Sequence, residues 1–165
     1  MPKEDGCRNN FFYTHLLTPN GIETFSQSIS SNIITDVGVG QAVFTPDGTK
    51  YIVTQGDNFD EPFLLDIYDF ERCTGKLSNK KQIVSLVATR DNGGSGVVVS
   101  PNSRFVYVTM WQKIIQYDLW ADDIKASEVV VAEYDGFVAT FPTGFLYPQL
   151  APDGRIYICT TNSTR

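Results

Sequence analysis

The stretch VFTPDGTKYIVT, residues 43–54, indicates the fold most clearly. Pro46 presets φ for a tight turn, Asp47 can hydrogen-bond to its own backbone, and Gly48 can adopt a positive φ. The run that follows the turn is β-branched, aromatic and almost continuously apolar. Because such a run is typical of a strand buried on both faces, the stretch predicts a tight hairpin inside a stack of sheets.

The same pattern occurs twice more, as VVSPNSRFVYVT at 98–109 and as LAPDGRIYICT at 150–160. The prolines of the three copies, Pro46, Pro101 and Pro152, are separated by 55 and 51 residues. A fixed period of this size is the sequence signature of a repeat architecture.

A second marker repeats with nearly the same period. LDIYDF at 65–70 recurs as IIQYDL at 114–119, which places Tyr68 and Tyr117 49 residues apart. Each copy is followed by a polar turn and another apolar run. Four short strands in a unit of about 40–50 residues is the size of a propeller blade.

These repeats predict an all-β chain. We expect a β-propeller segment of about three four-stranded antiparallel blades, a fragment of a larger propeller that forms one partial domain over residues 1–165. The expected units are 11–35 (partial), 38–90, 93–136 and 145–165 (partial). The expected strands are 11–17, 22–29, 41–45, 50–54, 63–70, 81–88, 96–100, 104–109, 113–119 and 128–134.

One segment has a competing interpretation. Residues 120–133, WADDIKASEVVVAE, have a composition that would also suit a helix. The repeat alignment and the run of three valines at 129–131 favour a strand there.

By this division the chain starts and stops within blades. Truncation of a longer chain is the favoured explanation. The alternative is that strands at 11–17 and 22–29 complete the last unit, so that two chains form a six-bladed ring and bury their open edges. A homo-oligomer is expected only if the chain is complete.

The Thr-Pro-Asp-Gly and Ala-Pro-Asp-Gly turns resemble those of the Pro-Asp-Gly propeller repeats found in WD-like and YVTN-type proteins. The stretch QLAPDGRIYI at 149–158 also resembles large secreted surface proteins of Bacteroidetes-type bacteria. The resemblance implies a β-propeller in the extracellular space or the cell envelope. The middle copy has Asn102-Ser103 in place of Asp-Gly, which predicts a differently built turn.

Composition excludes some partners. The chain has 13 basic and 19 acidic residues, a net charge of −6, and one basic cluster, Lys76, Lys80 and Lys81, which we expect to decorate a hairpin. Nucleic-acid binding needs more clustered positive charge. No run approaches the roughly 20 apolar residues that span a bilayer. We therefore expect neither a nucleic-acid partner nor a membrane span.

Few residues of the chain could act in catalysis or metal binding. His15, the single histidine, lies in a strand-like run without a nucleophile motif, so we predict a structural role and no catalytic residue. The three cysteines, Cys7, Cys73 and Cys159, form neither a disulfide framework nor a metal motif, and Cys159 is expected in the core. The glycine-rich segments 38–40 and 93–96 lack the Lys-Ser/Thr of a phosphate-binding loop, which favours close packing near the propeller axis.

The candidate ligand-binding residues lie in the connections between strands. Asp57, Asp60 and Glu61 belong to the acidic loop 55–62, whose oxygens would suit Ca²⁺, although a solvated loop without cofactor is the favoured interpretation. Trp111 and Gln112 belong to the corresponding connection in the next unit. Trp111 would either stack on a ligand or pack on the neighbouring blade.

The predicted function is non-catalytic binding or scaffolding within a larger secreted or cell-surface protein. A protein, peptide or glycan ligand would meet the mouth of the central channel or the face formed by two kinds of connection: those between the second and third strands of a unit and those between consecutive units. The alternative is part of a propeller enzyme, a lactonase-like hydrolase or a lyase, whose channel site is completed by further blades. The innermost strands present Gln41, Ser95 and Gln149, which are polar but are not catalytic acids or bases.

Overall fold

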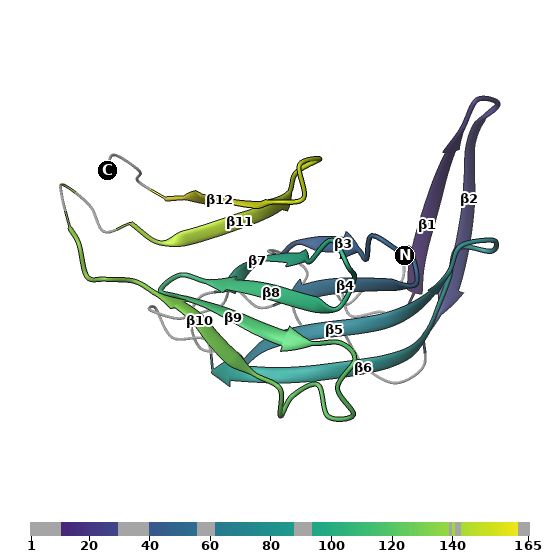
Figure 1. Ribbon diagram of the computed structural model, residues 1–165. Coiled ribbons are helices and arrows are strands. Elements are labelled where there is room, and N and C mark those ends of the chain that lie inside the picture. Colours follow the sequence, from purple (N-terminus) through teal and green to yellow (C-terminus); the bar gives the residue numbers. More distant parts are fainter. Residues whose placement is uncertain are drawn as a thin grey trace, which may run out of the picture.

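The fold is built from β-strands. The computed structural model describes residues 11–29, 40–55, 62–87, 94–138, 140 and 143–161. These ranges contain twelve strands in four antiparallel sheets and no helix (Figure 1). It follows that no helix in these ranges is long and apolar enough to cross a membrane.

Two sheets have four strands each, joined in sequence order. Sheet 1 consists of β3 (Ala42–Phe44), β4 (Lys50–Gln55), β5 (Pro62–Glu71) and β6 (Lys76–Val87). Sheet 2 consists of β7 (Gly94–Val99), β8 (Phe105–Met110), β9 (Lys113–Asp118) and β10 (Val129–Glu133). The predicted all-β propeller architecture is confirmed. The helical interpretation of residues 120–133 is wrong, because turns and bends at 119–127 lead directly into β10.

Two further sheets have two described strands each. Sheet 3 consists of β11 (Phe145–Leu150) and β12 (Ile156–Thr160), and it lies alongside β7 and β8 (Figure 1). The N-terminal hairpin consists of β1 (Phe11–Thr18) and β2 (Gly21–Ser28), and it projects away from the stacked sheets. The Gln27 side-chain amide anchors it to β6, because it accepts a hydrogen bond from Leu77 N–H and donates one to Leu77 C=O, each at 2.8 Å.

The hydrophobic core lies between sheets 1 and 2. Ile52, Leu65 and Ile67 from sheet 1 meet Val97 and Val106 from sheet 2, and each side chain is at most 2% exposed. Burial against a neighbouring sheet explains the nearly continuous apolar pattern of these strands. At about 25 cal/mol per Å² of apolar area, this stacking is the main favourable contribution to folding.

The hairpin turns are alike in the first and middle copies, so the prediction of a different middle turn is wrong. Gly48 has φ +67°, and Ser103 takes the same conformation with φ +59°. Asp47 Oδ1 accepts Thr49 N–H at 3.0 Å, and Asn102 Oδ1 accepts Arg104 N–H at 3.2 Å. The middle copy carries Ser103 in place of glycine, and its buried Oγ accepts Asp47 N–H from the neighbouring sheet at 3.0 Å.

Glycines on the innermost strands allow backbones to approach closely, as predicted. A Cβ added at Gly40 would lie 2.0 Å from Thr54 O, and one at Gly96 would lie 2.2 Å from Pro148 Cδ and 2.9 Å from Leu146 O. Real Cβ atoms do not approach this closely. The glycines therefore serve the packing of sheets 1, 2 and 3, which is a structural role.

Gln41 joins all three stacked sheets. Its Oε1 accepts Val97 N–H of β7 at 3.0 Å, and its Nε2 donates to Pro148 C=O of β11 at 3.2 Å. The backbone of Gln41 is held in turn by Thr54 on β4, whose N–H donates to Gln41 C=O at 3.0 Å. One side-chain amide therefore connects the innermost strands of consecutive blades.

The two full sheets share an ion pair at the same place in the repeat. Lys50 lies 2.9 Å from Asp69 in sheet 1, and Arg104 lies 2.7 Å from Asp118 in sheet 2. The hydrogen bond from Lys50 lowers the pKa of Asp69, and the hydrogen bonds from Arg104 lower the pKa of Asp118. Both pairs are partly exposed, so their contribution to stability is modest.

Sheet 1 also has a buried polar cluster. Lys80 Nζ lies 2.8 Å from Asp66 Oδ2, and both side chains are at most 4% exposed. Gln82 Nε2 donates to Asp66 Oδ1 at 2.8 Å, while burial, followed by the charge of Asp66, raises the pKa of Tyr68. The expectation that Lys80 decorates the hairpin surface is wrong: β6 begins five residues earlier than predicted, and its irregular pairing near Asn79 (φ +49°) turns Lys80 inward.

Cys159 also differs from its prediction, because it is exposed. It lies on β12 two residues from Tyr157, which is 55% exposed. Side chains alternate between the two faces of a strand, and this face of sheet 3 points away from sheet 2. The apolar run at 156–159 identified the strand correctly but did not show which face would be covered.

Candidate functional site

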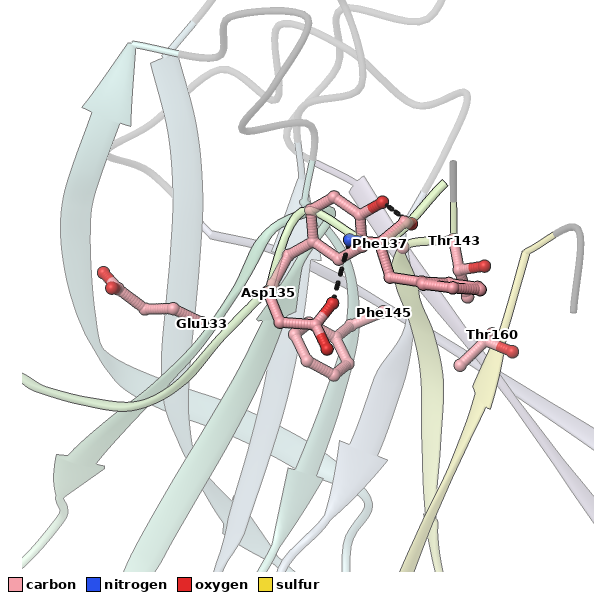
Figure 2. Close-up of a pocket in the computed structure, with 8 residues that line it drawn as sticks. Glu133, Asp135, Phe137, Thr143, Phe145 and Thr160 are labelled. Carbon is pink, nitrogen blue, oxygen red and sulfur yellow. Dashed lines mark hydrogen bonds between the residues drawn. The ribbon is translucent and has the colours of Figure 1, made fainter. Parts of the chain in front are cut away.

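A cleft of about 400 Å³ opens where the chain crosses from sheet 2 to sheet 3 (Figure 2). It combines aromatic rings, carboxylates and threonine hydroxyls. The described lining residues are Glu133, Tyr134, Asp135, Phe137, Thr143, Gly144, Phe145 and Thr160. The cleft therefore lies at the connection between the outermost strand of one blade and the innermost strand of the next, on the face predicted for ligand binding.

The first wall is the segment that leaves β10. Tyr134 N–H donates to Gln112 C=O at 2.7 Å, which holds the segment against the β8–β9 turn. Asp135 Oδ1 then accepts Phe137 N–H at 3.0 Å, and Gly136 between them has φ +79°. The Tyr134 hydroxyl closes the turn by donating to Phe137 C=O. These bonds fix the positions of an exposed carboxylate and an exposed aromatic ring at the cleft.

The second wall leads into β11. Phe145 N–H donates to Trp111 C=O at 2.9 Å, and Gly144 N–H donates to Thr161 Oγ1 at 3.2 Å. A Cβ at Gly144 would lie 2.5 Å from the Trp111 ring, so glycine is required for the wall to approach the indole. In Figure 2, Phe137 extends towards Thr143 and Thr160, Glu133 points the other way, and Asp135 lies between them.

The structure brings two of the predicted ligand residues to this site in a supporting position. The backbone carbonyls of Trp111 and Gln112 hold the two walls, and the Trp111 ring packs on the neighbouring sheet at Gly144. This is the packing alternative considered for Trp111. Neither residue lines the cleft directly among the described residues.

The other three predicted residues, Asp57, Asp60 and Glu61, lie outside the described residues, so the Ca²⁺ hypothesis stays a prediction. Within the described ranges, no group of three or more His, Cys, Asp or Glu side chains is placed to hold a metal ion. His15 is exposed on β1, and its Nδ1 lies 3.0 Å from Thr24 Oγ1 on the paired strand.

Sequence reasoning missed the residues that form the cleft, above all Asp135, Phe137 and Phe145. One local signal was present: Asp135-Gly136 directly after an apolar strand is a turn motif with a positive φ. Nothing local indicates that this turn faces residues 143–145, because the crossover between sheets brings the two segments together.

The cleft is suited to binding a polar ligand with a positive charge. Aromatic rings provide apolar contact area and attract cations through their faces. Asp135 adds negative charge to the cleft, whereas Glu133 points away from Phe137 (Figure 2) and forms an ion pair with Lys113 at 3.5 Å. Binding sites for small ligands usually combine a largely apolar surface with a few polar groups.

Comparisons with known proteins concern the fold alone. No family model matches the chain, and no curated protein matches its sequence significantly. A protein from Lactobacillus plantarum of known structure is similar in fold with a TM-score of 0.54 and 14% identity, over 92% of this chain and 45% of that one. The chain thus spans less than half the length of that protein.

Two further solved structures are more distantly similar, each with 14% identity. Hydrazine synthase from Kuenenia stuttgartiensis has a TM-score of 0.45, over 93% of this chain and 56% of that one. A candidate 6-phosphogluconolactonase from Bacteroides uniformis has a TM-score of 0.38, over 84% and 56%. Fold similarity at this level does not define an activity.

Proposed function

We propose that the chain is a non-catalytic binding segment of a β-propeller and that it holds a protein, peptide or glycan ligand in the cleft between β10 and β11. One observation supports this above the others. The cleft joins two rigid walls, each fixed by a backbone hydrogen bond to the β8–β9 turn, and exposes aromatic rings and carboxylates between them. Rigid placement of such groups lowers the entropy lost on binding.

The proposed setting is a larger secreted or cell-surface protein built from repeats of the Pro-Asp-Gly, WD-like or YVTN type. Its support is the resemblance of residues 149–158 to such proteins, together with a fold match that extends over only part of the neighbour's length. Protease treatment of intact producing cells tests it. Loss of the chain from intact cells supports the setting, and full protection contradicts it.

Unbiased screening tests the binding function. The intact chain is immobilised and screened against a random peptide library and a glycan array. Thr143→Trp fills the cleft, and Asn20→Trp at the exposed tip of the β1–β2 hairpin is the matched control. Binders that Thr143→Trp loses and Asn20→Trp retains support the proposal, provided that both variants melt as the unmodified chain does. Binders insensitive to Thr143→Trp contradict it.

A lactone-hydrolysis assay on the same preparation distinguishes the enzymatic alternative. Turnover that disappears in Asp135→Asn would replace the binding function with catalysis at this cleft. We expect no turnover, because the described lining combines carboxylates and hydroxyls without a histidine or cysteine nucleophile system.

A further inference from the structure

The strand next to the cleft has an open, apolar edge. β10 is the outermost strand of sheet 2 and pairs only with β9 in the described structure (Figure 1). Val129, Val130 and Val131 are 51%, 43% and 47% exposed. Tyr134 N–H points inward to Gln112. Because backbone groups alternate along a strand, those of Glu133 face the open edge.

β10 is short and has a bulge between Val130 and Ala132, but it lacks two further protections of the outermost strand of sheet 1. β6 carries Lys76 and Lys81 in exposed positions, and charged residues are a common device against edge pairing. Its backbone at Leu77 is also occupied, because the Gln27 amide bonds to both its N–H and its C=O. The outer edge of β6 is therefore hydrogen-bonded by a side-chain amide of the N-terminal hairpin. The outer edge of β10 has no described strand beyond it.

The charges near β10 indicate which kind of ligand could bind to its edge. Glu128, at one end of the valines, is paired with Lys125, and Glu133, at the other end, lies 3.5 Å from Lys113 and is followed by Asp135 in the cleft. The cleft end of β10 therefore carries the greater negative charge. A second copy that paired antiparallel along β10 would place Glu133 and Asp135 of one copy beside Glu128 of the other, whose charge Lys125 already balances, so the negative charge at the cleft would gain no cation. A peptide with an apolar extended segment and a basic end complements both the valines and the carboxylates.

We propose that β10 accepts an extended peptide as an additional antiparallel strand, with the peptide's N-terminal basic residue placed in the cleft near Asp135. β10 runs towards the cleft, so the antiparallel direction brings the N-terminus of the peptide there. Antiparallel pairing is also the slightly more stable arrangement per residue. The inference rests on the proposed function and identifies its ligand: backbone bonds supply affinity, and the basic side chain supplies specificity.

The test uses fluorescent peptides and the intact chain, with anisotropy as the readout. The probe KVTVTV carries its lysine at the N-terminal end, VTVTVK carries it at the other end, and both peptides have blocked termini, so that the lysine is the only charge. We expect KVTVTV to bind about tenfold more tightly, because only this peptide pairs its charge with the cleft. Equal binding of the two peptides overturns the assigned direction.

Backbone methylation tests strand addition directly. Two analogues of KVTVTV are N-methylated at alternate residues, one on the odd set and one on the even set. Strand addition predicts that one analogue loses binding and the other retains it, because only one set of N–H groups faces β10. If both analogues bind like the parent peptide, strand addition is overturned, while binding in the cleft still stands.

A matched pair of protein variants tests the charge. Asp135→Asn retains an acceptor for Phe137 N–H, and Asp153→Asn is the control, since Asp153 Oδ1 accepts Arg155 N–H at 3.0 Å in a similar exposed turn elsewhere. We expect Asp135→Asn to weaken KVTVTV about tenfold and Asp153→Asn to leave it unchanged. Equal effects of the two variants overturn the assignment of the basic residue to the cleft.

The remaining outcomes separate this inference from the proposed function. Glycans that bind in the cleft when no peptide binds overturn the peptide inference and leave the binding function standing. A dimer in size-exclusion chromatography that Val130→Lys dissociates would show that a second copy covers the edge. Failure of both peptides and glycans to depend on the cleft overturns both proposals.

Discussion

The side chain of Gln41 is predicted to stabilise the stack of sheets more than any other single polar group on the innermost strands. Its amide accepts Val97 N–H and donates to Pro148 C=O, so it connects three sheets at once. Gln41→Met keeps the length of the side chain and removes both hydrogen bonds. The position therefore tests whether the stacked sheets fold as one cooperative unit.

The expected loss follows from the environment of Val97, which is fully buried. Two net hydrogen bonds contribute about 1 kcal/mol each, and an unpaired buried N–H costs about 1–3 kcal/mol. Part of these values overlaps, so we expect Gln41→Met to lower the free energy of unfolding by about 3 kcal/mol. For a chain of this size that corresponds to a decrease of roughly 6–12 °C in Tm.

Urea denaturation followed by circular dichroism measures this change. Gln149→Met is the matched control, because Gln149 lies exposed on the innermost strand of sheet 3. A surface substitution of this kind is expected to change stability by less than about 0.5 kcal/mol. If Gln41→Met lowers the free energy of unfolding no more than Gln149→Met does, the Gln41 amide does not hold the three sheets together.

Three further predictions concern stability. Ser103→Ala keeps the positive φ but loses the hydrogen bond to Asp47 N–H, so it should lower the free energy of unfolding by about 1–2 kcal/mol. Ser103→Gly should cost less, because glycine adopts a positive φ without strain. Equal melting temperatures of the two variants would contradict this. Gly96→Ala should lower the free energy of unfolding by about 1–3 kcal/mol through overpacking against sheet 3, and an unchanged urea midpoint would contradict the close approach. Lys80→Met should lower the free energy of unfolding by about 3–5 kcal/mol, because it leaves the Asp66 carboxylate buried without this cation. The double variant Lys80→Met/Asp66→Leu should recover part of that loss. If its loss equals the sum of the losses of the two single variants, the two residues do not act as a pair.

A fifth prediction concerns stability at acidic pH. The folded-state pKa of Asp118 is lowered from its ordinary value of 3.8, so its contribution to stability is present above pH 3.8 and is lost as the pH falls through the lower folded-state value. Asp118→Asn should therefore flatten the acid limb of a plot of stability against pH. An unchanged acid limb would show that the pair with Arg104 is not linked to folding.

The repeat allowed most of the fold to be predicted from the sequence. Turn chemistry at Thr45–Thr49, the apolar runs that follow and the innermost glycines are local features, and the structure has each of them as expected. The strand boundaries agree within a few residues except at β6. There a polar segment was taken for a turn, because the sequence does not show that Lys80 would pair with Asp66 inside the sheet.

The candidate site was predictable only as a face. Trp111 and Gln112 lie at the connection that supports the cleft, but Asp135 and Phe137 were not identified, because their proximity to Phe145 depends on how one sheet packs on the next. The role of Ser103 was likewise not predictable from the local sequence. Its departure from glycine is explained by Asp47, which belongs to the previous copy of the repeat and is distant in sequence.

Hydrogen exchange on the intact chain shows directly whether a ligand binds in the β10–β11 cleft. The ligand is the tightest binder from the random peptide library, chosen without reference to the cleft, and amide protection is compared with and without it. We predict added protection at 129–137 and 143–145, with little change on the β1–β2 hairpin. Protection confined to other strands, or to the hairpin, would contradict the assignment of binding to the β10–β11 cleft.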